Sequence, residues 1–378
     1  MRKNEIFHLL LIGIVSLGVA TAGFFTGKYL TLRNLRKDMK LVYRSWALGD
    51  LVPRRSLEIL SPAYGDKALF LSKVKEIIWS PKNVPAPFVN NCPAPGPQMN
   101  APINSLQLRS HRELTLPKPP GVYRIFLTGG SVAFGCGALS HGHIISEYLE
   151  TLLNSSPGRP PETTYEVFTA ANPAWASTHE RIFIENRLSE WQPDLVISFS
   201  GNNDVHWGFY GENVLWFWNY ADRYFFSCLT KYFIWGNNHL QDVTVKDPGQ
   251  VHPELVAARL AKNIRLSAEC LKIAGSRYLF VLQPNYWLIR KPFSFIEKSI
   301  IPEDREKERY FINCYSKIDQ TLKKLPVTDL QYINFTDVFD GIPENETIFI
   351  DHYHFVDKGN EIVAKTLFNN IKGIVFVK

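Results

Sequence analysis

Residues 123–135 read YRIFLTGGSVAFG, and this stretch decides the fold class. Its first half is a short apolar run typical of a buried strand, and it then turns through Gly129 and Gly130 into a helical pattern. Ser131 therefore stands at the carboxyl end of a strand, which in open α/β sheets is the edge where ligands bind. Read alone, the turn is also compatible with a tight βα connection in which Ser131 only caps the helix.

Short apolar runs and longer helical segments alternate along the chain after residue 120. The predicted strands are 123–127, 165–170, 195–200, 278–282 and 331–335. The predicted helices are 143–153, 178–190, 253–274, 303–323 and 358–371, with Asp357 as the N-cap of the last one. Strands that alternate with helices predict βα units and a mainly parallel sheet.

A second polar motif, Gly201-Asn202-Asn203-Asp204, directly follows the apolar run 195–200. Because that run is also a predicted strand, the motif lies at the same sheet edge as Ser131. The side-chain amide of Asn203 can there donate an N–H to an oxyanion that develops during a reaction. The alternative interpretation is an Asx turn that ends the strand.

The third motif, Asp351-His352-Tyr353-His354, follows another apolar run. An Asp and a His three positions apart can meet by local folding. The carboxylate of Asp351 would then accept the Nδ1–H of His354, which leaves Nε2 to take a proton from Ser131. A metal site and an ordinary surface loop are the alternatives for this cluster, and His352 is the rival base.

Together the three motifs resemble the SGNH hydrolases, also called GDSL-type esterases and lipases. Residues 104–109 and 123–135 resemble the family's nucleophile region, residues 201–204 its G-x-N-D block and residues 351–354 its D-x-x-H block, in the family's order. The resemblance covers the chain from about residue 103 onward. It implies an α/β three-layer sandwich with a mainly parallel, five-stranded, flavodoxin-like sheet.

The resemblance also implies a role for each matching residue. Ser131 would be the nucleophile, His354 the base and Asp351 its orienting partner. The oxyanion hole would contain the backbone N–H of Ser131 and the side chain of Asn203. The backbone N–H of Ala171 would complete it.

Two positions depart from the family pattern. Gly130 replaces the Asp that usually precedes the nucleophile, a change that leaves the geometry of the Ser possible. Thr169-Ala170-Ala171 replaces the usual Asn-x-Gly. The methyl group of Ala171 narrows the approach that a glycine would leave open, which favours a small acyl group or lowers the activity.

The N-terminus is strongly apolar. Residues 6–25 carry no Asp, Glu, Lys or Arg and reach the roughly 20 residues that a membrane-spanning helix needs. We predict that residues 1–40 form an uncleaved, single-pass membrane anchor with a basic flank, although Ala20-Thr21-Ala22 offers a signal-peptidase pattern. The heavier basic flank on the C-terminal side favours a cytoplasmic body. The family resemblance favours a catalytic domain outside the cytoplasm, and that is our prediction.

The remaining chain divides in two at a change of composition. Residues 41–119 are rich in proline, and the run 81–97 predicts a loop-like linker or N-terminal extension. Residues 120–378 form the predicted hydrolase domain.

An aromatic insertion, residues 205–240, interrupts the hydrolase domain. Trp207, Trp216 and Trp218 are predicted to form a lid or a stacking wall for the substrate, or part of an interfacial helix on the membrane. A second membrane span is disfavoured, because Asp222 and Arg223 would each cost about 2.5–3.5 kcal/mol in the bilayer. The alternative is that the rings fill the core of a subdomain.

Composition excludes several classes of protein. The chain is 45% hydrophobic and 21% charged, as ordinary globular proteins are, and its net charge of +6 forms no basic face over a nucleic-acid-binding module. The five cysteines lack metal-ligand spacing, and no G-x-G-x-x-G after a strand, P-loop or His-Glu-x-x-His motif occurs. We therefore expect no cofactor, no metal and no nucleic-acid partner. The sequence does not indicate an oligomeric state.

The leading hypothesis from this resemblance is a serine esterase. It would cleave an ester, such as an O-acetyl group, on a cell-surface polysaccharide or lipid through an acyl-Ser131 intermediate. An O-acetyltransferase with the same triad is the first alternative. The second is a non-catalytic binding or assembly protein of an envelope polysaccharide system, since a fold does not fix a function.

Overall fold

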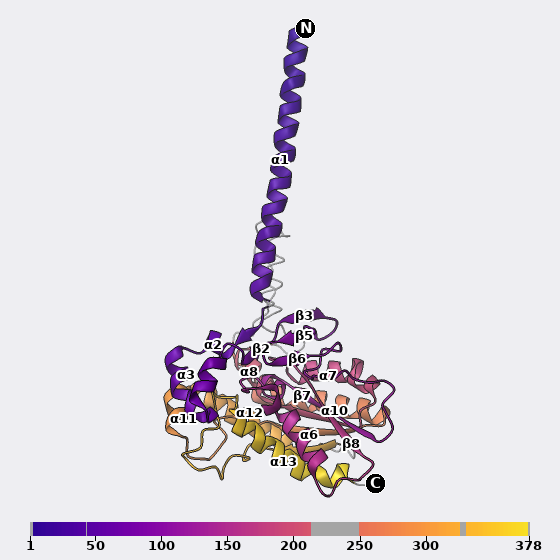
Figure 1. Ribbon diagram of the computed structural model, residues 1–378, viewed down its shortest axis with the longest axis vertical. Helices are drawn as coiled ribbons and strands as arrows, with labels where there is room; N and C mark the ends of the chain where they lie inside the picture. The colour runs from indigo at the N-terminus through magenta and orange to yellow at the C-terminus, as the bar shows by residue number, and fades with distance from the viewer. Residues whose placement is uncertain (1–2, 43, 213–248, 326–329, 377–378) are drawn as a thin grey trace. The chain divides into compact units, whose positions relative to one another are not determined.

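The computed structural model of the chain describes residues 3–42, 44–212, 249–325 and 330–376 (Figure 1). The described residues fall into two compact units. Residues up to 44 belong to the first unit, and the other described residues belong to the second. All three polar motifs lie in the second unit.

The first unit contains one long helix, α1 (Lys3–Val42). An 18-residue window within Asn4–Lys40 has a mean hydropathy of 2.1, and none of that window is buried in the structure. The predicted N-terminal apolar helix is confirmed, and its length and composition suffice to cross a membrane. At 1.5 Å per residue, its 40 residues span roughly 60 Å, twice the thickness of a bilayer's hydrocarbon core.

A five-stranded parallel sheet forms the centre of the second unit. Its strands are β7 (Val122–Gly129), β8 (Thr164–Ala171), β9 (Leu195–Ser200), β10 (Arg277–Leu282) and β11 (Leu330–Asn334). The spatial order β8-β7-β9-β10-β11 is the flavodoxin-like order 2-1-3-4-5. The predicted fold class is therefore confirmed. The ends of each predicted strand lie within two residues of the observed ends.

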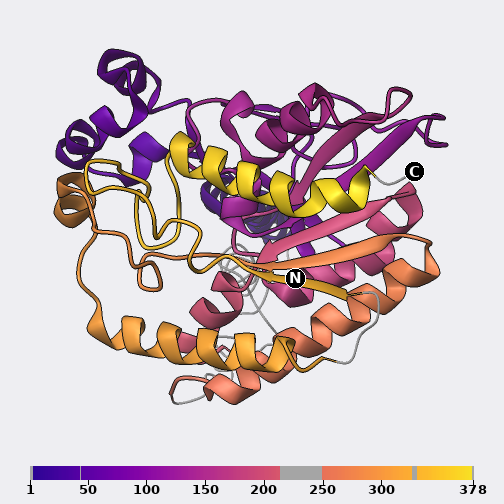
Figure 2. The same cartoon turned by 90° about the horizontal axis from the view of Figure 1, so that it is seen from below.

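Helices cover both faces of the sheet (Figures 1 and 2). One layer contains α6 (Ile145–Ser155) and α13 (Asp357–Val375), and the other contains α7 (Ser177–Asn186), α10 (Pro253–Ile273) and α12 (Arg305–Leu322). Alternate strand residues point to opposite faces, so that Leu127 and Ile197 pack in the first layer's core while Phe126 and Val196 pack in the second's. Burial on both faces explains why most strand residues are apolar.

Residues 46–103 hold short helices and hairpins where the prolines predict a loop-like linker. The helices are α2 (Leu48–Leu51), α3 (Arg54–Leu60) and α4 (Lys67–Lys73). The paired strands are β1 (Trp46–Ala47) with β2 (Ile78–Ser80), β3 (Asn83–Ala86) with β4 (Asn90–Pro93), and β5 (Gly96–Gln98) with β6 (Ala101–Ile103). Leu57 and Phe70 are buried in one cluster with Ile350 and Val356 from the other end of the chain. The segment is therefore packed within the second unit.

The ends of the predicted helices differ from the observed ends by up to four residues. The N-cap of α13 is Val356, and Asp357 is already helical. The carboxylate of Asp357 instead accepts the backbone N–H of Leu139 (2.9 Å) and pairs with Nδ1 of His143 (3.1 Å). The predicted helix 178–190 ends at Asn186 and is followed by a 3₁₀ turn. Tertiary partners therefore decide the role of Asp357.

Candidate active site

Ser131 is the first residue of a one-turn helix, α5 (Ser131–Phe134), which directly follows β7. The turn into this helix needs glycine twice. A Cβ on Gly129, whose φ is +152°, would lie 2.4 Å from the carbonyl oxygen of Phe199. A Cβ on Gly130 would lie 2.2 Å from Nδ2 of Asn203. The glycine that replaces the usual Asp thus lets the amide of Asn203 lie directly against the turn that carries Ser131.

His354 links Ser131 to Asp351. Its Nε2 lies 2.7 Å from Oγ of Ser131, and its Nδ1 lies 2.8 Å from Oδ2 of Asp351. A carboxylate accepts a proton donor, so Nδ1 carries the hydrogen and the Nε2 lone pair faces the hydroxyl. The structure therefore brings the three predicted triad residues together in one hydrogen-bonded chain.

Asp351 is held as an anion. Its Oδ1 accepts the backbone N–H groups of Tyr353 (2.7 Å) and His354 (2.8 Å). Burial alone would raise the pKa of Asp351, but the charge of His354 and these hydrogen bonds keep it below its usual value. A charged carboxylate orients the imidazole and stabilises the imidazolium that forms on proton transfer.

His352, the rival base, points elsewhere. Its Nε2 donates to the carbonyl oxygen of Pro302 (2.8 Å), and its ring stacks on Trp287 with centroids 4.4 Å apart. The geometry thus selects His354 from the two histidines of this loop. Across the described parts of the chain, no group of three or more His, Cys, Asp or Glu side chains could hold a metal ion.

One predicted oxyanion donor, Asn203, lies against the turn that carries Ser131. Asn203 lies in the first turn of α8 (Asn202–Phe209), and one of its Nδ2 hydrogens is donated to the carbonyl oxygen of Trp175 (2.6 Å). That bond fixes the amide and leaves its second N–H available. Ala171 ends β8 beside Gly129 and is buried.

The predicted aromatic wall has one described member. Trp207 is 3% exposed, and its Nε1 donates to the carbonyl oxygen of Ala174 (3.2 Å). Ala174 has a φ of +69°, which an alanine adopts only when its surroundings hold it there. Trp207 thus lies in the interior and supports the loop that holds Asn203. Trp216 and Trp218 lie outside the described residues.

Removal of the Asn203 amide is expected to slow turnover strongly. Asn203→Ala should lower kcat about 100- to 1,000-fold with little change in KM, because the amide would act on the charge that develops in the transition state. Asn203→Asp, which keeps the shape but loses the N–H donors, should lose at least as much. Steady-state kinetics on a p-nitrophenyl ester measures both, and a loss confined to KM would contradict this role.

Comparison with known proteins returns similarities among solved structures. No protein-family model matches the sequence, and no curated protein matches it either. An acetylxylan esterase from Geobacillus stearothermophilus is 15% identical with a TM-score of 0.40, over 68% of this chain and 96% of that one. A GDSL-like lipase from Bacteroides thetaiotaomicron is 13% identical with a TM-score of 0.37, over 66% and 88%. The acetyl xylan esterase AlAXEase is 17% identical with a TM-score of 0.37, over 66% and 99%.

The strand order and the place of the three motifs on it decide the fold. Ser131 follows the first strand of the sheet, Asn203 follows the third, and the loop with Asp351 and His354 precedes the last helix. The chain has a flavodoxin-like α/β fold, with the three motifs where the resemblance to SGNH hydrolases predicts them. Its buried Arg109, which precedes the sheet, donates to the carbonyl oxygens of Phe134 (2.8 Å) and Gly135 (3.0 Å) and so secures the nucleophile turn.

The sequence did not predict a role for Trp79. This residue belongs to β2, which precedes the strands of the central sheet in the chain. Its ring centroid lies 4.4 Å from that of His354. Two hydrogen bonds join this strand to the loop after α5. The N–H of Gly137 donates to the carbonyl oxygen of Ile78 (3.0 Å), and the thiol of Cys136 donates to the carbonyl oxygen of Trp79 (2.8 Å). The apolar run Ile77-Ile78-Trp79 was the signal available in the sequence.

Loss of the Trp79 ring is expected to disturb the orientation of His354. Trp79→Ala should lower kcat about 10-fold and KM much less, because small displacements of a catalytic group reduce the rate of the chemical step. Trp79→Phe, which keeps a ring against the imidazole, should recover most of the activity. Phe88→Ala, which removes an exposed ring from the same segment, is the control. Equal activities of the Ala and Phe variants would exclude a positioning role.

Proposed function

We propose that the chain is a serine esterase that works through an acyl-Ser131 intermediate. The observation that carries this proposal is the continuous chain of hydrogen bonds from Asp351 through His354 to Oγ of Ser131, with distances of 2.8 and 2.7 Å. These are the contacts that activate a hydroxyl nucleophile. The fold alone would not support an activity, since it hosts many.

The proposed reaction has two halves. Oγ of Ser131 attacks the ester carbonyl carbon while Nε2 of His354 takes the hydroxyl proton, and the negative charge collects on the carbonyl oxygen beside Asn203. The C–O bond to the alcohol then breaks, and His354 returns the proton to the departing alkoxide. In the second half, water loses a proton to His354, attacks the acyl carbon and releases the acid, and Ser131 regains its proton.

We infer that the acyl group is small. This rests on the resemblance, in which Ala171 occupies the place of a glycine and its methyl group narrows the approach. An acetyl ester on a cell-surface polysaccharide or lipid fits this limit. An O-acetyltransferase would use the same acyl enzyme but pass the acyl group to a sugar hydroxyl in place of water.

A fluorophosphonate probe and a p-nitrophenyl ester series test the activity. We expect the probe to label the wild-type chain and acetate to be cleaved faster than octanoate. A transferase would be identified by the addition of a sugar acceptor. An acetylated sugar would then form, and less free acetate would be released. A chain that neither reacts with the probe nor cleaves any ester of the series would exclude both enzymes.

We further propose that α1 anchors the protein in a membrane with the catalytic unit outside the cytoplasm. The length and hydropathy of α1 support the anchor. The basic residues that follow the apolar stretch favour the opposite orientation. A phosphatase reporter fused after Lys378 should be active, because this reporter works only outside the cytoplasm. A stable but inactive fusion would reverse the orientation.

A further inference from the structure

Lys307, in the first turn of α12, is a buried cation with an incomplete set of partners. The residue is 8% exposed. Its Nζ lies over three aromatic rings, 5.1 Å from the centroid of Tyr210, 5.4 Å from that of Tyr353 and 5.6 Å from that of Phe209. No hydrogen bond or ion pair joins this Nζ to a described residue. The backbone N–H of Lys307 donates to the carboxylate of Asp304 (3.0 Å).

This arrangement leaves the ammonium short of acceptors. Ring faces attract a cation, but they replace none of the three strong hydrogen bonds that water gives an ammonium. Burial accordingly lowers the pKa of Lys307, while the charges of Asp304 and Asp351 oppose that shift. An anion that entered beside Nζ would supply the missing acceptor.

The lysine lies close to the triad. Tyr353, whose ring Nζ faces, is the chain neighbour of His354, and the centroids of these two rings are 6.4 Å apart. Phe209 and Tyr210 come from α8 and the residue after it, the helix that begins with the Asn203 motif. The cage around Lys307 is therefore built from the same two segments that supply the base and the oxyanion donor.

Among the described residues, the nearby groups form no ion pair with the ammonium of Lys307. The ring of His206 lies 5.9 Å from that of Tyr353. Burial, followed by the positive charge of Lys307, lowers the pKa of His206 to about 3, so His206 is neutral at physiological pH. Asp351, the nearest acid of the site, is already committed to His354 and two backbone N–H groups.

We propose that Lys307 and the rings of Phe209, Tyr210 and Tyr353 form a subsite for an anionic group, a carboxylate or a phosphate, on the alcohol portion of the ester. This proposal rests on the proposed esterase function. The alcohol oxygen must approach Nε2 of His354 to receive its proton, and the Nζ of Lys307 faces the ring of Tyr353, the residue next to His354. The preferred substrates would then be acetylated acidic sugars or acetylated alcohol phosphates.

Binding to the Ser131→Ala chain tests the subsite without turnover. The ligands are an O-acetylated methyl glucuronide, its uncharged carboxamide and an O-acetylated glycerol phosphate, each titrated by calorimetry. We expect at least one anion to bind about 10- to 100-fold tighter than the carboxamide, as charge-assisted hydrogen bonds allow. Tighter binding of the glucuronide would identify a carboxylate as the ligand, and tighter binding of the glycerol phosphate would identify a phosphate.

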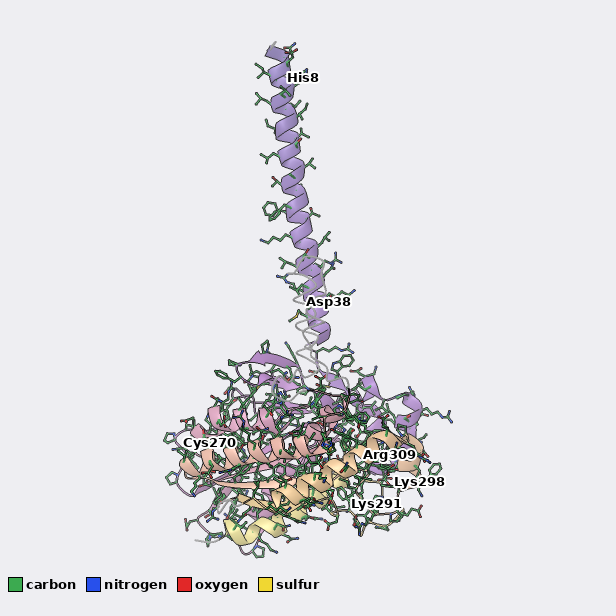
Figure 3. The ribbon with its side chains drawn as sticks, turned by 180° about the vertical axis from the view of Figure 1, so that it is seen from behind. His8, Asp38, Cys270, Lys291, Lys298 and Arg309 are labelled. Atoms are coloured by element: carbon green, nitrogen blue, oxygen red, sulfur yellow. The ribbon has the colours of Figure 1, made fainter. Side chains whose placement is uncertain are left out.

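Matched variants in the same background assign the effect to Lys307. Lys307→Met keeps the apolar stem and should abolish the preference for the anion while leaving the binding of the carboxamide within about twofold. Lys307→Arg should retain most of the preference. Lys298→Met is the control, since Lys298 lies at the surface of this unit (Figure 3) and pairs with exposed Glu344 (2.7 Å).

Three outcomes would overturn the subsite. They are equal binding of charged and uncharged ligands, a preference that survives Lys307→Met, and no measurable binding of either anion. Failure of the proposed esterase function gives a different result. The anion preference would still depend on Lys307, but Ser131 of the wild-type chain would not react with a fluorophosphonate and the chain would cleave no ester. In that case the subsite stands and the proposed reaction is rejected.

Discussion

Ser131→Ala is expected to abolish ester cleavage and fluorophosphonate labelling together. The substitution removes the Oγ atom that lies 2.7 Å from Nε2 of His354. Without this nucleophile no acyl-enzyme can form. We expect kcat to fall by at least about 10,000-fold, because residues that act as one unit cannot replace each other. The residual rate would come from substrate binding and the oxyanion donors alone.

A nearby serine provides the control for this experiment. Ser140 carries a hydroxyl 3.1 Å from Nδ1 of His143, so Ser140→Ala also breaks a hydroxyl–imidazole contact but leaves the triad intact. Its activity and labelling should stay within about twofold of wild type, as is usual for a surface substitution of small energetic effect. If Ser131→Ala kept more than a small fraction of the wild-type rate, the acyl-enzyme mechanism would be rejected.

Asp351→Asn is expected to have the next largest effect, a loss of about 10,000-fold in kcat, as the corresponding change has in other triads. The side-chain oxygen of an Asn can still accept the N–H groups of Tyr353 and His354, so its amide nitrogen faces Nδ1. An amide N–H there requires an unprotonated Nδ1, which moves the hydrogen to Nε2. The imidazole then donates to Ser131 and can no longer act as its base.

The reading of Asp351→Asn depends on an intact fold. The two backbone hydrogen bonds that survive should keep the thermal midpoint within a few degrees of the wild type, a shift that corresponds to about 1 kcal/mol. Fluorophosphonate labelling should slow in parallel with kcat, since both need an activated hydroxyl. A loss of less than about tenfold would mean that Asp351 only supports the loop.

Much of the fold could be predicted from local pattern. The run 278–282 is apolar throughout and the run 195–200 has only Ser198 and Ser200 as polar residues, because both faces of a parallel sheet are covered, and each is an observed strand. Ser131 and Asn203 each directly follow such a strand. Since the carboxyl ends of parallel strands meet at one edge, local sequence was enough to place these residues together.

Local pattern failed where the structure depends on distant partners. Asp357 has the chemistry of an N-cap, yet it is used by Leu139 and His143, more than 200 positions away in the chain. The prolines of residues 41–119 predict a linker or N-terminal extension, because strands of two to four residues have too few positions to show a period. Their burial against Ile350 and Val356 is a long-range contact.

The sequence by itself determined the α/β class, the apolar N-terminal helix and the three polar motifs, since each follows from the periodicity or chemistry of adjacent residues. Only the tertiary structure decided that Trp79 packs against His354, that His352 points away from Ser131, and that Lys307 lies buried among rings beside the triad. These relations join segments far apart in the chain. Their energy comes from packing and desolvation between those segments, which no window of adjacent residues records.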